Sequence, residues 1–82
     1  MDKEPGQKRG LSEHVKESVE NYFESLNGEQ PYGVYSMVLS EMERPLLTVV
    51  MKHCQNNQSK ASKVLGINRN TLRKKLESYG LV

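Results

Sequence analysis

Apolar residues recur at steps of three and four from Leu11 to Leu26, a pattern that predicts one amphipathic helix. The apolar positions are Leu11, Val15, Val19, Tyr22, Phe23 and Leu26. Glutamates occupy the other face of this helix. Ser12 can cap its start and Asn27-Gly28 supplies a left-handed stop, so both ends are indicated independently of the period.

The segment before Leu11 has no such pattern. Residues 1–10 combine two glycines, one proline and five charged side chains with Met1 as the one apolar residue. A segment of this composition cannot bury enough apolar surface to offset the entropy lost on ordering. Residues 1–10 are therefore expected to form a disordered tail.

A second, longer apolar stripe predicts a helix over residues 34–55, about 33 Å long at the usual rise per residue. Its members are Val34, Tyr35, Val38, Leu39, Met42, Leu46, Val49, Val50 and Cys54. Pro45 lies inside the stripe, but the period continues on both sides of it, which predicts a kink rather than a break. Further apolar residues widen the stripe beyond one face, so residues 11–55 are expected to pair with a partner chain. The expected dimer core is Val38, Leu39, Met42, Leu46, Val49 and Val50.

The last third of the chain has two short helical patterns separated by a glycine turn. Helices are predicted over residues 58–65 and 69–79, with Gly66-Ile67-Asn68 between them, which together make a helix-turn-helix. The expected inward positions are Ala61, Val64, Leu65, Leu72 and Leu76. Asn57 can cap the first of these helices and Asn68 the second. The predicted fold class is therefore all-α, with four helices per chain in one single domain.

Composition bounds the chain to one small domain, since it has 82 residues of which 35% are hydrophobic. The single cysteine, Cys54, cannot form an internal disulfide, so dimerisation is the expected source of further burial. One thiol fits a reducing, cytoplasmic compartment. Because no apolar run approaches the roughly 20 residues of a membrane span, a soluble protein with no membrane partner is expected.

Basic charge is concentrated in residues 57–82. Residues 57–82 contain six lysines and arginines and one acidic residue. Residues 1–56 contain six lysines and arginines and nine acidic residues. Basic and amide side chains crowd the first two turns of the predicted last helix: Asn68, Arg69, Asn70, Thr71, Arg73, Lys74 and Lys75. Arginine and asparagine can hydrogen-bond purine edges while threonine and lysine hold phosphates, so residues 56–82 are expected to bind DNA. Double-stranded DNA is favoured, because single-strand binders use aromatic stacking platforms and Tyr79 is the sole aromatic residue here. A solvated basic face on an ordinary helical hairpin is the alternative.

The preceding predicted helix starts with a polar turn that can clamp a phosphate. Its residues are Asn57, Gln58, Ser59 and Lys60. A capped, solvated helix start explains each of them equally well. No catalytic residue, cofactor or metal site is expected. His53 and Cys54 cannot act as a catalytic Cys-His pair, because adjacent residues on a helix point about 100° apart.

Three stretches of the chain resemble the Fis (factor for inversion stimulation) family of bacterial DNA-binding proteins. They are NYFESLNG, ERPLLTVVM with its internal proline, and NQSKASKVLGINRNTLRKKLESYG. The resemblance covers residues 11–82. It implies a homodimer in which the first two helices of each subunit interlock into a bundle and two helix-turn-helix units stand on one side. It further implies a nucleoid-associated protein that binds double-stranded DNA with weak sequence preference, bends it, compacts the chromosome, and modulates transcription and DNA recombination.

The resemblance also implies roles for single residues. Arg69 would contact a base edge, guanine above all, and Asn68 an adjacent base. The residues expected at backbone phosphates are Asn57, Ser59, Thr71, Arg73 and Lys74. Lys60 and Lys75 would reach flanking DNA once it wraps. Ser59 replaces the threonine of the family and keeps its hydroxyl.

One departure from the family concerns partners. RNA polymerase and a site-specific recombinase are further partners that the resemblance suggests, but the family contacts a recombinase through a longer N-terminal hairpin arm. Only ten residues precede the first predicted helix here, and they do not form a two-strand pattern. Recombinase contact is therefore not carried over, whereas DNA binding and bending do not depend on the arm.

Two rival functions remain at this point. The same helix pair ends many enhancer-binding transcription activators, of which this chain would be a terminal module; Met1 and the match through both bundle helices argue against it. The second rival is a helical adaptor whose basic end binds an acidic protein. Unlike a DNA-bending protein, such an adaptor would leave the shape of DNA unchanged.

Overall fold

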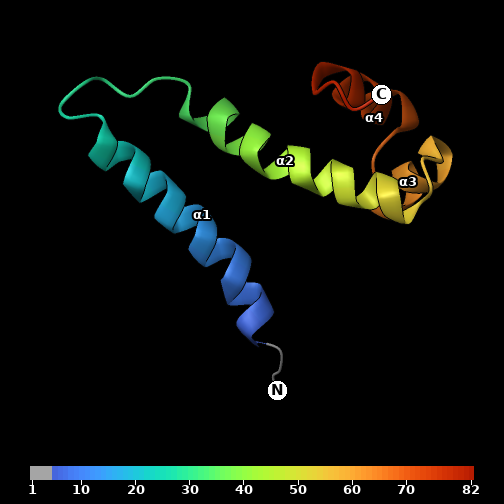
Figure 1. Ribbon diagram of the computed structural model, residues 1–82, viewed down its shortest axis with the longest axis horizontal. Coiled ribbons are helices and arrows are strands. Elements are labelled where there is room, and N and C mark those ends of the chain that lie inside the picture. Colours follow the sequence, from blue (N-terminus) through green and yellow to red (C-terminus); the bar gives the residue numbers. More distant parts are fainter. Residues whose placement is uncertain (1–4) are drawn as a thin grey trace. The chain divides into compact units, whose positions relative to one another are not determined.

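The computed structural model describes residues 5–82, with side chains from residue 10 onward. These residues form four helices and no strand: α1 (Pro5–Ser25), α2 (Val34–His53), α3 (Gln58–Leu65) and α4 (Arg69–Ser78) (Figure 1). The predicted all-α class is confirmed. The chain divides into two compact units, and the boundary falls within α2 after Val38.

The start of α1 differs from the prediction. The helix begins at Pro5 instead of Leu11, so residues 5–10, which were expected in a disordered tail, are helical. Residues 1–4 of that tail lie outside the described part of the chain. Proline suits the first helical position because its φ is already helical and its missing N–H would have no partner there. Ser12 accordingly lies inside α1 and does not cap it.

The end of α1 matches the prediction. The helix stops at Ser25, whose hydroxyl donates a 2.8 Å hydrogen bond to the carbonyl of Tyr22. Asn27 and Gly28 follow with φ of 53° and 88°. This left-handed pair ends the helix as Asn-Gly sequences commonly do.

Helix α2 continues through Pro45, as the unbroken apolar period predicts. Proline removes the backbone donor that would bond the carbonyl of Glu41, four residues earlier. Glu41 is exposed, so water can hydrate that carbonyl. The helix ends at His53, two residues before the predicted end. Cys54 follows, and then Gln55 and Asn56 adopt positive φ and redirect the chain into α3.

The helix-turn-helix is capped by side chains, as predicted. Asn57 Oδ1 accepts a 3.0 Å hydrogen bond from the backbone N–H of Lys60, which starts α3. Gly66, with φ of 77°, ends α3 through a 2.8 Å bond from its N–H to the carbonyl of Ser62. Asn68 Oδ1 then accepts from the N–H of Asn70 at 2.7 Å and starts α4. One local contact therefore starts α3, and two more determine the turn between α3 and α4.

One apolar core joins α2, α3 and α4. Its buried members are Leu47, Met51, Cys54, Ala61, Leu72 and Leu76, and the partly buried residues packed on them are Val50, Leu65, Ile67, Tyr79 and Leu81. The inward positions predicted for α3 and α4 are confirmed except for Val64, which is 56% exposed. Ser62 is buried in its place, because the inward face of this short helix follows Ala61, Ser62 and Leu65. Cys54, the last member of the apolar stripe predicted for residues 34–55, is a core residue at 2% exposure.

Three members of the predicted dimer core lie on a different face of α2 from the core within the chain, whereas Val50 packs on that core. Leu47, Met51 and Cys54 form the buried stripe, whereas Met42, Leu46 and Val49 are exposed, Val49 by 65%. The remaining members, Val38, Leu39 and Val50, are half-buried. Pairing of two chains through this exposed stripe stays a prediction. Within residues 5–82 no helix combines the length and hydropathy of a membrane span.

Candidate nucleic-acid interface

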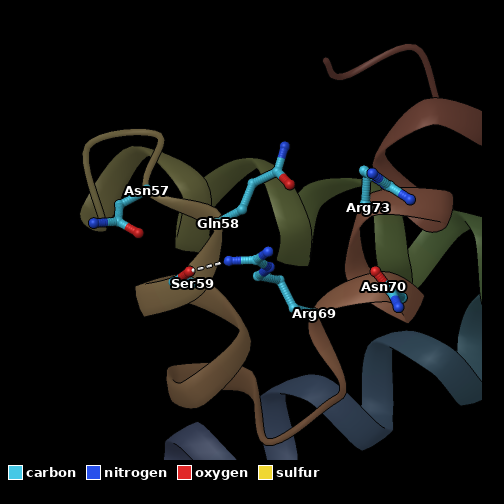
Figure 2. A pocket seen from close by; sticks show the side chains of 6 residues that line it. All are labelled: Asn57, Gln58, Ser59, Arg69, Asn70 and Arg73. Carbon is cyan, nitrogen blue, oxygen red and sulfur yellow. Dashed lines mark hydrogen bonds between the residues drawn. The ribbon is translucent and has the colours of Figure 1, made fainter.

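The first turns of α3 and α4 lie side by side and enclose a shallow pocket of about 180 Å³. Figure 2 shows its lining, with three residues from the start of α3 and three from α4. They are Asn57, Gln58, Ser59, Arg69, Asn70 and Arg73. All six are polar, two are arginines and none is acidic, so the pocket has the chemistry of an anion site.

The backbone adds to this positive character. The first turn of a helix has N–H groups without intrahelical partners, and the helix dipole places partial positive charge there. Asn57 and Asn68 each use a side-chain oxygen to cap one N–H group, of Lys60 and Asn70. The starts of both helices line one pocket, together with Arg69 and Arg73. The helix dipoles and the two guanidinium groups therefore all favour an anion at this place.

Arg69 spans the pocket. Its Nη1 donates a 2.8 Å hydrogen bond to Ser59 Oγ, and Figure 2 shows the guanidinium directed from α4 toward the start of α3. A guanidinium has five N–H donors in a rigid plane, so this bond orients the group and uses only one of them. Ser59 and Arg69 are both exposed, so the remaining donors face solvent. The hydroxyl of Ser59 therefore orients the guanidinium of Arg69 across the pocket.

Five of the ten residues predicted to bind DNA line this pocket: Asn57, Ser59, Arg69, Asn70 and Arg73. Gln58 joins them, although sequence reasoning treated it only as part of a polar turn. Four others, Lys60, Asn68, Thr71 and Lys74, are exposed nearby on α3 and α4 but do not line the pocket. The structure thus brings the two predicted polar turns together, while the DNA contacts themselves remain predictions.

Lys75 differs from the other predicted residues. Its Nζ lies 2.9 Å from Glu43 Oε2, and its side chain is only 33% exposed. The lysine therefore forms an ion pair with α2 and does not extend from the surface. Sequence reasoning missed Glu43 because it precedes Lys75 by about thirty residues and belongs to the predicted dimerisation helix.

Glu43 also binds Tyr79, the residue that ends α4. The phenol hydroxyl donates a 2.6 Å hydrogen bond to Glu43 Oε1. The bond from Lys75, followed by the one from Tyr79, lowers the pKa of the Glu43 carboxyl, because both favour the carboxylate. The same bond to Glu43 raises the pKa of Tyr79, since the protonated phenol is the donor. Both groups are thus held in the forms that bind each other.

Comparison with known proteins places the chain in a family. The family described as "Bacterial regulatory protein, Fis family" matches residues 38–79. Proteins named "Putative Fis-like DNA-binding protein" from Neisseria meningitidis serogroups A and B are each 56% identical over 72 residues, covering 88% of this chain and 91% of theirs. A "DNA-binding protein Fis" from Glaesserella parasuis serovar 5 is 52% identical over 73 residues, covering 89% of this chain and 74% of its own. The chain therefore belongs to the Fis family of bacterial regulatory proteins.

Proposed function

We propose that this protein is a homodimeric, nucleoid-associated protein that binds and bends double-stranded DNA through paired helix-turn-helix units. The observation that supports DNA binding most directly is the pocket formed by the starts of α3 and α4, with two arginines and no acid in its lining. Backbone donors at helix starts suit phosphate, and the planar donors of arginine suit guanine. The relatives from Neisseria meningitidis and Glaesserella parasuis are named as DNA-binding proteins, which agrees with this proposal.

The proposed contacts divide into base recognition and positioning. Arg69 contacts a base edge in the major groove with the donors that Ser59 leaves unused, and Asn68 approaches the next base. The residues proposed at phosphates are Asn57, Ser59, Thr71, Arg73 and Lys74. Lys60 is exposed beside them and contacts the flank of the site, and Asn70 contacts DNA from the lining of the pocket. Lys75 contributes less than its charge suggests, because Glu43 neutralises it.

Dimerisation is supported by the apolar stripe on α2 that the chain leaves uncovered. Met42, Leu46 and Val49 are 38%, 45% and 65% exposed, at the spacing of one helix face. Exposed apolar residues in such a row commonly mark an interface. A second copy of α2 would cover them and place two helix-turn-helix units on one duplex.

Bending follows from pairing two recognition helices rigidly. If they stand closer than one turn of B-DNA, the duplex must bend and its central minor groove must narrow before both helices enter the major groove. Affinity then depends on how easily the centre of the site deforms. Such changes of DNA shape support the proposed roles in transcription, recombination and chromosome compaction in the cytoplasmic nucleoid.

The test is a gel-shift titration on short duplexes that differ only in an A/T-rich or G/C-rich centre, with the binding site placed at the middle or at the end. We expect tighter binding to the A/T-rich centre and a mobility that depends on the position of the site. Lys16→Ala serves as the charge-matched control for Arg69→Ala, because Lys16 is an exposed cation on α1. Arg69→Ala should weaken binding while Lys16→Ala leaves it near the wild-type value.

Two results would contradict the proposal in different ways. Binding with a mobility that is independent of site position would remove bending and favour the activator-module function. Failure to bind any duplex at low salt would remove DNA binding itself, and would favour an adaptor that binds an acidic protein.

A further inference from the structure

Two consecutive residues of α2 hold the C-terminal end of α4. Glu43 accepts from the Tyr79 hydroxyl with one carboxylate oxygen, at 2.6 Å, and pairs with Lys75 through the other, at 2.9 Å. Arg44 Nη1 donates a 3.0 Å hydrogen bond to the carbonyl of Tyr79. The Arg44 guanidinium carbon also lies 5.3 Å from the centre of the Tyr79 ring, a cation–π distance. We call these four residues, Glu43, Arg44, Lys75 and Tyr79, the α2–α4 clamp.

Three members of the clamp, Glu43, Lys75 and Tyr79, are more shielded from solvent than most of the pocket, whereas Arg44 is exposed. The Glu43 side chain is 15% exposed, and Tyr79 packs on the apolar core to which Leu72 and Leu76 belong. Carboxylate hydrogen bonds in such partly buried surroundings are stronger than on an open surface, and they are directional. The clamp therefore fixes an orientation that apolar contact alone would not specify.

The positions of these residues around α4 show which movement the clamp resists. Successive residues turn by about 100° around a helix. On this basis the buried Leu72 and Leu76 share one stripe, Lys75 and Tyr79 lie along one edge of it, and the pocket residues Arg69 and Arg73 lie along the opposite edge. A roll of α4 about its own axis would swing both edges together, and the clamp holds one of them.

We propose that Glu43 is a positioning residue for DNA recognition: by holding Tyr79 and Lys75 it sets the roll of α4, and with it the direction of Arg69 and Arg73. This rests on the proposed function, because it deepens the account of how the helix-turn-helix meets DNA. Glu43 touches no DNA in this mechanism. Because it stands on α2, the proposed dimerisation helix, it also ties the orientation of each recognition helix to the dimer.

Three variants and a control test this role. Glu43→Gln keeps the shape and removes the anion, Tyr79→Phe keeps the ring over which Arg44 lies and removes the hydroxyl, and the swap Glu43→Lys with Lys75→Glu restores an ion pair with reversed signs. Glu41→Gln is the matched control, since it changes the net charge equally from an exposed position on α2. Each protein is first checked for helical content and dimer state at the assay temperature.

The measured quantity is the ratio of affinities for a preferred and a non-preferred duplex, together with the position-dependent mobility of the bent complex. Loss of one acid strengthens binding to every duplex, so the ratio, unlike the affinity, is insensitive to net charge. We expect Glu43→Gln and Tyr79→Phe to lower the ratio about threefold to tenfold, in the lower part of the range of coupling between residues in contact. Glu41→Gln should keep the wild-type ratio, and the swap should recover part of it.

Wild-type ratios and mobilities in folded Glu43→Gln and Tyr79→Phe dimers would overturn the positioning role, even if both proteins were less stable to heat. If Glu43→Gln does not fold, Tyr79→Phe decides, since it retains the ring and the ion pair. Failure of the wild-type protein to bind duplex DNA would instead overturn the proposed function, so the two failures are distinguishable.

Discussion

Arg69 of α4 donates a 2.8 Å hydrogen bond to Ser59 of α3, and this contact joins the first turns of the two helices of the helix-turn-helix. The bond is formed between exposed side chains, so on its own it adds little stability. Its effect is geometric, because it directs a flexible arginine across the pocket before any ligand arrives. Pre-orientation of this kind lowers the entropic cost of binding.

Removing Arg69 should weaken binding selectively. We expect Arg69→Ala to cost about 1–3 kcal/mol per half-site on preferred duplexes and much less on others, because an arginine at a base edge discriminates by that amount. Competition gel shifts with duplexes that differ at one base per half-site measure this. Equal losses on every duplex would show that Arg69 contacts phosphate alone.

Lys74 should behave in the opposite way. It is exposed on α4 and outside the pocket, the position of a side chain that reaches a phosphate. We expect Lys74→Ala to weaken all duplexes alike and to make the slope of log affinity against log salt shallower by about one per subunit. Titrations at four or five salt concentrations give the slope. An unchanged slope with altered discrimination would exchange the roles of Lys74 and Arg69.

The local features of this fold were predictable from the sequence. Asn57 and Asn68 cap α3 and α4, and Gly66 turns between them, because each needs only neighbours within four residues. The two polar turns that line the pocket were predicted for the same reason. The start of α1 was not, since Pro5 and the residues after it lack the apolar period from which a helix is inferred, although they permit one.

The features that were not predicted depend on contacts between distant residues. Glu43 and Tyr79 are 36 positions apart, and nothing in the pattern of either helix indicates that they meet. The two apolar stripes of α2 have similar composition, so the sequence did not show that Leu47 and Met51 face the core while Val49 stays exposed. The sequence contains the residues that form a tertiary contact, but which residues meet depends on how the helices pack.

An acid on the uncovered stripe of α2 should separate the proposed dimer. We expect Val49→Asp to raise the dimer dissociation constant at least about 100-fold, because it buries an unpaired charge at the interface. Val64→Asp is the control, since Val64 is similarly exposed but lies on α3. Sedimentation equilibrium measures both. A fully dimeric Val49→Asp protein would place the interface elsewhere.

The junction between α2 and α3 makes a prediction about backbone strain. Asn56 has φ of 65°, and its N–H donates a 2.8 Å bond to the carbonyl of Met51. A β-branched residue pays about 1–2 kcal/mol in this left-handed region, whereas glycine adopts it freely. We expect Asn56→Val to lower the free energy of unfolding by that amount and Asn56→Gly to change it little. Urea unfolding at one fixed protein concentration tests this, and equal effects would contradict it.

The clamp should make stability depend on pH. Its charged and titratable members are Glu43 and Arg44 from α2, Lys75 from α4, and Tyr79, which caps the end of α4. The pKa of Glu43 is lowered in the folded protein, chiefly by the bond from Lys75, so its contribution is complete above the unfolded pKa, about 4.3, and is lost as the pH falls through the folded value. The pKa of Tyr79 is raised, chiefly by the bond to Glu43, so its contribution is complete below the unfolded pKa, about 10, and is lost as the pH rises through the folded value.

We therefore expect wild-type protein to be more stable than Glu43→Gln across the neutral range, with the difference shrinking below about pH 4 as Glu43 becomes protonated. Urea unfolding of both proteins from pH 3 to pH 7, at one dimer concentration and one ionic strength, measures the difference. Glu41→Gln again controls for net charge, and its curve should run parallel to that of the wild type. Parallel curves for Glu43→Gln and wild type would mean that the bonds from Lys75 and Tyr79 contribute nothing to folding, and α4 would then be held by its apolar face alone.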